Sequence, residues 1–248
     1  MDTNTEANKQ KKARDTSWLE CERWWIFALM MCIGGFYGGY TYSCRGGVFC
    51  NAQTANIVLF SMSIGHADWG KALYYLIPMA AYLGGTILSE YLPNTVKKHS
   101  HIRWDTVFVG FEMLVVLILG FIPESAPVQI SHILVNFMCS MQYNTFRRAE
   151  NIPMATTFCT NHVRQIGVYL VKWFKHKNEH NFLRRSLYHT GMIAVFIIGV
   201  TTATILSRFF GIRTIWFAEI LLLGTFADLL HADLTKEKGM LDRVPKGH

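Results

Sequence analysis

The sequence predicts an all-α fold, a polytopic bundle of transmembrane helices. The 248-residue chain is 51% hydrophobic and only 17% charged, whereas soluble domains carry about 25% charged residues. Its mean hydropathy is positive, at +0.19. The uncharged residues form long runs, close to the roughly 20 residues that a helix needs to cross a hydrocarbon core. The lipid bilayer is therefore the expected partner of this chain.

The net charge of +7 raises the alternative of a nucleic-acid partner. The basic residues, however, lie between the apolar runs and at the two ends of the chain. Orientation in a membrane demands this distribution, and no nucleic-acid-binding signature accompanies it. We therefore expect no nucleic-acid partner.

The order of the segments predicts a transmembrane domain over residues 18–232, between cytoplasmic tails at 1–17 and 233–248. The first tail is polar and lysine-rich, which is typical of disorder. The first apolar run is too long for a signal-peptide core, and no small-residue cleavage site follows it. Six spans are expected in all, at Trp24–Cys44, Ala72–Tyr91, Trp104–Phe121, Val128–Phe146, Leu187–Leu206 and Ile212–Leu230.

Two polar stretches between these spans, residues 46–66 and 152–170, decide the topology. If both enter and leave on the same side, nearly all lysines and arginines become cytoplasmic, and the chain spans six times. If both cross the membrane, the chain spans eight times and the basic cluster at 97–103 lies outside. The positive-inside rule favours six spans, with both termini cytoplasmic in a cell (inner) membrane. Eight spans remain the open alternative.

An internal repeat relates residues 24–121 to residues 128–230. One offset lays Thr54 over Thr160, and an offset one residue longer lays Glu112 over Glu219. Each half then reads span, polar break, span, span, and in the six-span model the halves run antiparallel. Inverted repeats of this kind build secondary transporters, whose solute sites form at broken polar segments. Chance similarity between apolar segments is the alternative explanation.

The candidate substrate-binding residues are uncharged amides and hydroxyls near the breaks or at the end of the fourth span. Such groups donate and accept hydrogen bonds without a charge, which suits a solute stripped of water. The alternative is that they join helices to one another. They are Asn51, Gln53, Thr54, Asn56, Gln142, Asn144, Thr156, Thr157, Thr160 and Asn161.

Two glutamates within predicted spans, Glu112 and Glu219, are the candidate proton-coupling residues. A carboxylate in mid-span is costly and faces the interior of a bundle or a cavity. A structural carboxyl, protonated or paired with arginine, is the alternative, and Arg164 is the expected charge partner. No catalytic motif is present, and cysteines and histidines lack metal-ligand spacing. We therefore expect no enzyme activity, cofactor or metal site.

The runs "GGYTYSCRGGVFCNAQTANIVL" and "MQYNTFRRAENIPMATTFCTNHV" resemble the paired motifs of the YoaK family of uncharacterised bacterial integral membrane proteins. The resemblance covers residues 24–230 and implies a membrane location without implying an activity. Alanine stands at position 55 and asparagine at 161, where the family has glycine. The motif residues carried over by position are Asn51, Thr54, Asn56, Gln142, Arg147, Thr156, Thr157 and Thr160.

The combined prediction is a secondary transporter of a small polar or ionic solute, with proton coupling through Glu112 or Glu219. The alternative is a non-transporting membrane scaffold or partner subunit, in which the polar breaks only pack. A membrane-embedded enzyme is a third possibility, which would need a converging catalytic set. The identity of the solute, the direction of transport and the oligomeric state are left open by the sequence.

Overall fold

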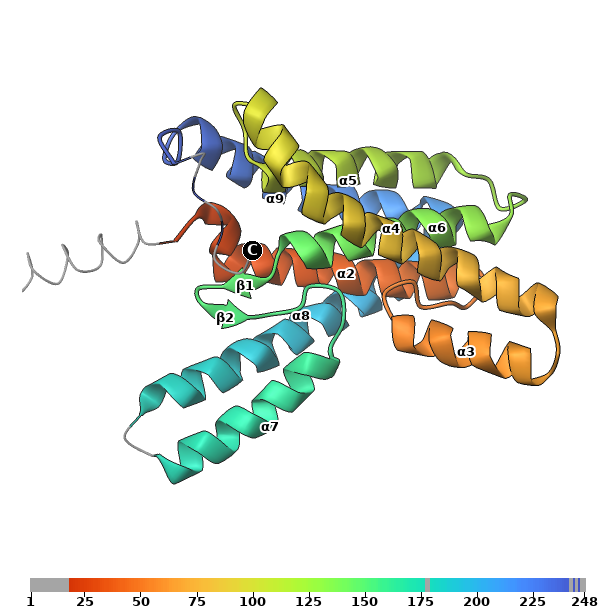
Figure 1. Ribbon diagram of the computed structural model, residues 1–248, viewed down its shortest axis with the longest axis horizontal. Coiled ribbons are helices and arrows are strands. Elements are labelled where there is room, and N and C mark those ends of the chain that lie inside the picture. The colour runs from red at the N-terminus through yellow and green to blue at the C-terminus, as the bar shows by residue number, and fades with distance from the viewer. Residues whose placement is uncertain (1–17, 177–178, 241–242, 244, 246–248) are drawn as a thin grey trace, which may run out of the picture.

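The computed structural model describes residues 18–176, 179–240, 243 and 245, and the predicted N-terminal tail lies outside them. The fold is helical, as predicted, with one two-stranded hairpin between α6 and α7 (Figure 1). The elements are η1 (Glu20–Glu22), α2 (Trp24–Cys44), α3 (Gln53–Gly65), α4 (Trp69–His99), α5 (Trp104–Phe121), α6 (Val128–Thr145), β1 (Arg148–Ala149), β2 (Ile152–Pro153), α7 (Thr160–Lys175), α8 (His180–Phe210), η2 (Gly211–Phe217) and α9 (Ala218–Leu234).

Within the described residues, three stretches are long and apolar enough to cross a membrane. They are Trp69–Lys97, Trp104–Phe121 and the continuous helical stretch Asn181–Leu234. The predicted spans at α2 and α6 also form helices, but these two helices are not apolar enough to be counted with the three stretches. Both are inner helices, with most of their residues buried against other helices. Because protein surrounds them, their Ser, Asn and Gln side chains can form hydrogen bonds with neighbouring helices.

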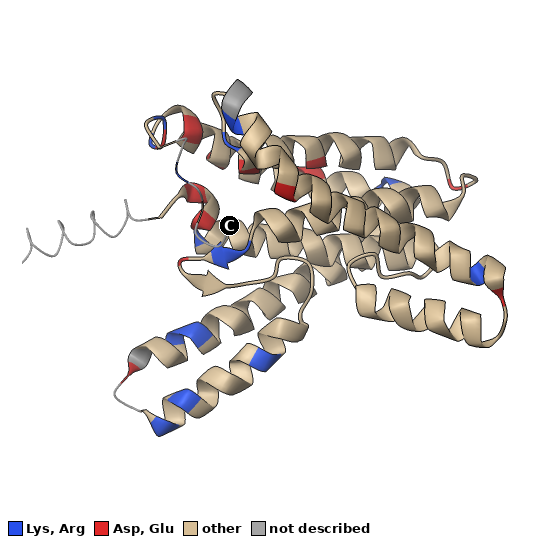
Figure 2. Ribbon diagram, viewed as in Figure 1, with Lys and Arg blue, Asp and Glu red and all other residues tan. Residues whose placement is uncertain are grey.

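The outer helices expose large apolar side chains. On α4, Leu83 is 61% exposed and Ile87 is 60% exposed. On α8, Ile197 is 56% exposed and Ile198 is 57% exposed. Figure 2 shows the charged residues gathered toward the ends of the helices, while the middles of the helices are almost free of them. Exposed apolar side chains that adjoin one another mark a surface that contacts something other than water. Together these features indicate a membrane protein.

Two helix pairs form the centre of the bundle: α2 packs along α8, and α4 packs along α6. Glycines let the backbones approach closely in both pairs. A Cβ atom on Gly39 of α2 would lie 2.8 Å from the Val200 carbonyl oxygen of α8. A Cβ atom on Gly85 of α4 would lie 2.5 Å from the Phe137 carbonyl oxygen of α6. Small residues at such crossings are the usual basis of close helix packing in membranes.

The helices α3 and α7 are attached to the two long outer helices at opposite ends of the molecule. Contacts place α3 beside α4 and α7 beside α8. Figure 1 shows α7 and the first half of α8 extending away from the bundle near the end that holds η1, whereas α3 lies at the far end. Each of these two helices therefore follows one polar break and leads outward from the centre.

The described start and end of the chain meet at one end of the bundle. The Glu20 backbone N–H donates to Oε1 of Glu237 at 2.6 Å, and Lys236 Nζ lies 3.6 Å from Oε2 of Glu20. Burial raises the pKa of both glutamates above the usual value. At the opposite end, the buried Arg45 guanidinium donates to the carbonyl oxygen of Ile122 at 2.8 Å. It thereby satisfies backbone acceptors where α5 ends.

Candidate functional site

The two polar breaks meet each other in the middle of the bundle. Asn51 is 7% exposed, and its Nδ2 donates to the carbonyl oxygen of Thr157 at 2.8 Å. The same amide donates to the Gly34 carbonyl oxygen at 3.3 Å. One side chain therefore joins the first break, the second break and the midpoint of α2. The sequence predicted both breaks, and the structure brings them into direct contact.

Glycines within α2 and just after its end make room for this contact. Gly46 and Gly47 adopt positive φ angles of 81° and 70°, which lets the chain turn back toward the centre after α2 ends. A Cβ atom on Gly38 would lie 3.2 Å from Nδ2 of Asn51, and one on Gly34 would lie 3.1 Å from Cα of Thr157. The breaks therefore pack directly on the backbone of α2.

The inner helix α6 supplies the next polar groups. Gln53 Nε2 donates to Oδ1 of Asn136 at 2.6 Å. Gln142 Nε2 donates to the Met30 carbonyl oxygen at 2.9 Å and to the Thr156 carbonyl oxygen at 3.4 Å. Asn136 was not among the sequence candidates. The sequence feature that could have identified it is an asparagine in the middle of a predicted span, where a polar side chain needs a protein partner.

Several polar atoms at this centre have no partner. Thr156, Thr157 and Gln142 are fully buried. Oγ1 of each threonine and Oε1 of the glutamine form no hydrogen bond in the structure. Buried polar atoms are almost always paired, because leaving one unpaired costs about 1–3 kcal/mol. A bound water, ion or solute would pair these atoms, which makes the cluster a candidate binding site.

The remaining sequence candidates lie around this centre or away from it. Asn56 is buried, with Nδ2 3.5 Å from Oε1 of Gln53. Asn144 lies near the end of α6 and donates to Oγ of Ser89 at 2.9 Å. The side chains of Thr54 and Thr160 are exposed, on the first turns of α3 and α7. The structure therefore does not bring these two threonines into the polar contact.

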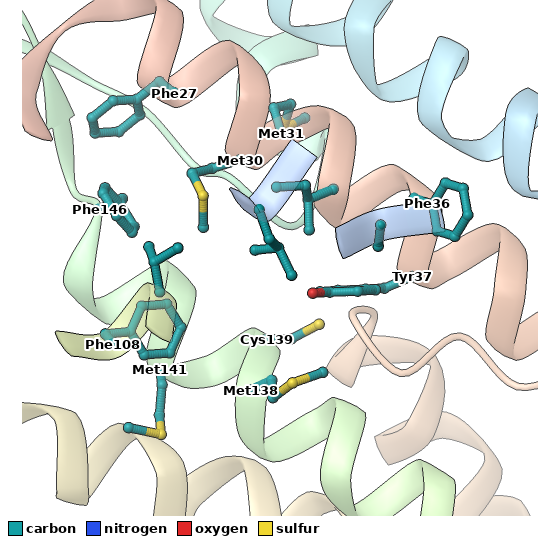
Figure 3. Packing of buried hydrophobic residues seen from close by; sticks show 14 of the residues in the cluster. Phe27, Met30, Met31, Phe36, Tyr37, Phe108, Met138, Cys139, Met141 and Phe146 are labelled. Atoms are coloured by element: carbon teal, nitrogen blue, oxygen red, sulfur yellow. The ribbon is translucent and has the colours of Figure 1, made fainter. Parts of the chain in front are cut away.

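The two glutamates lie on α5 and α9, which pack against each other. Glu112 is fully buried, its Oε1 accepts a hydrogen bond from the Tyr37 hydroxyl at 2.9 Å, and its Oε2 has no partner. Glu219 is partly buried and also has an unpaired buried oxygen. Figure 3 shows Tyr37 reaching from α2 into the core, near Cys139 of α6.

The predicted ion pair between Arg164 and a glutamate is not formed. Arg164 is exposed on α7, a helix that packs on α8 and not on α5 or α9. Among the described residues, neither glutamate makes an ion pair with it. The reason is that Arg164 lies on the outward side of α7, away from the side on which His162 and Tyr169 are buried.

A cavity of about 290 Å³ opens beside the second break. It lies between the end of α6, the β1–β2 hairpin and the start of α7. Arg147 also pairs with Glu90 of α4, whereas Arg148 is exposed. The cavity walls consist of Tyr143, Asn144, Arg147, Arg148, Pro153, Met154, Ala155 and Asn161.

Comparison with known families gives one match. Residues 26–227 match the family model described as a protein of unknown function, DUF1275. The chain belongs to this family. The search of curated proteins and the search of solved structures returned no match. The range that DUF1275 covers includes both polar breaks and both glutamates, while Glu20 and Glu237 lie outside it.

Proposed function

We propose that the chain is a secondary transporter of a small polar or ionic solute, and that its two polar breaks form one solute site. Within DUF1275, we propose that it is related to the YoaK group, on the two motif runs given above. The membrane would be a cell (inner) membrane. The proposal assigns the chain no enzymatic activity.

One contact carries the proposal. Asn51 and Thr157, which touch, are 106 residues apart, and that separation is the offset that laid Thr54 over Thr160. In an inverted repeat, equivalent residues near the twofold axis face one another, so this contact is expected on the axis. Glu112 and Glu219, which an offset one residue longer relates, lie on α5 and α9, and these two helices pack together. The Asn51–Thr157 contact therefore supports the repeat.

The order and packing of the helices support the same repeat. The helix that follows the short helix is 31 residues long in each half, α4 in the first and α8 in the second. The contact of α2 with α8 has its counterpart in the contact of α6 with α4. The helices α3 and α7 lead from the centre to opposite ends (Figure 1), as re-entrant segments from opposite sides would.

This arrangement supports six spans, at α2, α4, α5, α6, α8 and α9. The contact between Glu20 and Glu237 is consistent with an even number of crossings, because it brings both ends of the described chain to one side. The distribution of lysines and arginines assigns that side to the cytoplasm. The unpaired atoms of Thr156, Thr157 and Gln142 supply hydrogen-bonding groups for the solute. Glu112 and Glu219 would carry the coupled proton.

The test is solute-driven flux by the purified full chain in sealed liposomes that contain a pH-sensitive dye. We expect a gradient of at least one small polar or ionic solute to change the internal pH. The variant Thr156→Val/Thr157→Val, which keeps volume and removes the two hydroxyls, is expected to lose this response. The matched control is Thr202→Val, because Thr202 is exposed on α8.

The runner-up function is a non-transporting scaffold or partner subunit. Its support is that the Asn51 amide donates to the backbone carbonyl oxygens of Gly34 and Thr157, as the side chain of a packing residue would. If the chain is a scaffold, no solute gradient changes the internal pH. Removal of the two threonine hydroxyls then makes no difference to the result. The same liposome experiment therefore separates the two functions.

A further inference from the structure

We infer that the solute is a small anion, held where the N-termini of α3 and α7 approach the Asn51–Thr157 contact. The inference rests on the proposed transport function and adds the chemical class of the solute. It is carried by the direction of two helices, by unpaired buried hydroxyls and by the charges around the cavity beside the second break.

Both short helices point their N-termini toward the centre. The helix α3 begins at Gln53, two residues after Asn51, and α7 begins at Thr160, three residues after Thr157. The N-cap residues are Ala52 and Cys159, and neither forms a side-chain capping hydrogen bond. Helix N-termini carry free N–H groups and a partial positive charge, which together favour anions.

Side-chain caps are also absent at the starts of α2, α5, α6, α8 and α9, so the feature that α3 and α7 share is that both begin close to the same buried polar contact. A bound anion would accept hydrogen bonds from those N–H groups in place of a capping side chain. The two helices come from opposite halves of the chain and lead to opposite ends of the molecule (Figure 1). Their positive ends would therefore face an anion from two sides.

The threonine hydroxyls provide an independent observation. Thr156 and Thr157 lie four and three residues before the start of α7, are fully buried, and have no hydrogen-bond partner for Oγ1. A hydroxyl donates one hydrogen bond and can direct it to an anion. A ligand at the start of α7 would pair these atoms and the free N–H groups of the helix at the same time.

The cavity beside the second break lies next to the two threonines along the chain, because Met154 and Ala155, which directly precede Thr156, line it. Its walls include Arg147 and Arg148 and, among the residues that line it, no carboxylate. The ion pair with Glu90 partly neutralises the charge of Arg147. Arg148 is exposed and contributes the second positive charge to the cavity wall. Asn161 lines the same cavity and belongs to the first turn of α7. A cleft lined by positive charge raises the local concentration of anions.

The test is ligand-induced stabilisation of the full chain in detergent, measured as the midpoint of thermal unfolding at constant ionic strength. The probes are phosphate and succinate as anions, choline as a cation and glucose as a neutral solute. At saturation we expect phosphate or succinate to raise the midpoint by about 2–4 °C or more. Choline and glucose are expected to leave it unchanged.

Two variants locate the effect. Thr156→Val/Thr157→Val is expected to abolish the anion-induced shift, while Thr202→Val retains it. Arg148→Gln, which changes an exposed residue, is expected to raise the anion concentration needed for the shift and so serves if the double variant does not fold.

Three results would overturn the anion inference: no shift with either anion, a shift with choline or glucose alone, or an anion shift that survives both variants. If the liposome experiment then finds flux of a cation or a neutral solute, the transport function stands and only the anion inference fails. If no solute produces flux, the transport function fails as well.

Discussion

Replacement of Glu112 by glutamine is expected to abolish solute accumulation driven by a proton gradient while leaving solute exchange across the membrane intact. Glutamine keeps the shape of the carboxyl group and can still accept the Tyr37 hydrogen bond, but it cannot bind or release a proton. One pH unit is worth about 1.4 kcal/mol and can therefore support about a tenfold accumulation per coupled proton. Glu112→Gln should remove this accumulation entirely.

The measurement uses sealed liposomes with an imposed pH gradient and, separately, with equal pH and labelled solute on one side. Tyr37→Phe is the matched control, since it removes the hydroxyl that contacts Glu112 and retains the carboxyl group. We expect Tyr37→Phe to change the pH dependence of uptake without abolishing accumulation. Accumulation by Glu112→Gln at the wild-type level would exclude this residue as the proton carrier and leave Glu219 as the candidate.

Replacement of Gly199 by valine is expected to cause the largest loss of stability among single substitutions between helices. A Cβ atom at this position would meet the Cys32 carbonyl oxygen and would lie 2.9 Å from the Phe36 amide nitrogen. These are backbone atoms of α2, so the two helices must separate to accept any side chain. Overpacking of this kind costs about 1–3 kcal/mol and, against rigid backbone, more.

The measurement is denaturant or thermal unfolding of the purified chain in detergent. Gly191→Val is the matched control on the same helix, because nothing lies within 4 Å of a Cβ atom there. Valine has a higher helix propensity than glycine, so the control should be neutral or slightly stabilising. Equal unfolding midpoints for the two variants would contradict the close α2–α8 packing on which the central contact depends.

The sequence predicted the helices that lie in long apolar runs, but it did not predict the path of the chain after the two polar breaks. The bounds of α2 and α5 agree with the predicted spans Trp24–Cys44 and Trp104–Phe121, because uninterrupted apolar runs end there in polar or helix-breaking residues. It did not predict that each break continues as a helix, α3 or α7. Those helices are short or amphipathic, and hydropathy averaged over a membrane thickness does not register them.

The candidate site was predicted in part. Asn51 and Thr157 were candidates on separate breaks, and the structure joins them by a hydrogen bond from Asn51 to the Thr157 carbonyl oxygen. Thr54 and Thr160 are exposed, because one turn of helix rotates neighbouring residues onto different faces. The pairing of Arg164 with a glutamate was wrong for the same reason. Tyr37 was missed as the partner of Glu112 because a tyrosine in an apolar span is indistinguishable by sequence from a packing residue.

The most direct test of a shared, alternately opening site is the accessibility of positions 51 and 157 from the two sides of the membrane. Asn51→Cys and Thr157→Cys would be placed singly in a cysteine-free chain, in sealed vesicles, and exposed to a membrane-impermeant thiol reagent. The inverted arrangement predicts labelling of Asn51→Cys from outside and of Thr157→Cys from the cytoplasmic side. If both stay unreactive from both sides, the breaks only pack, and the chain is a scaffold.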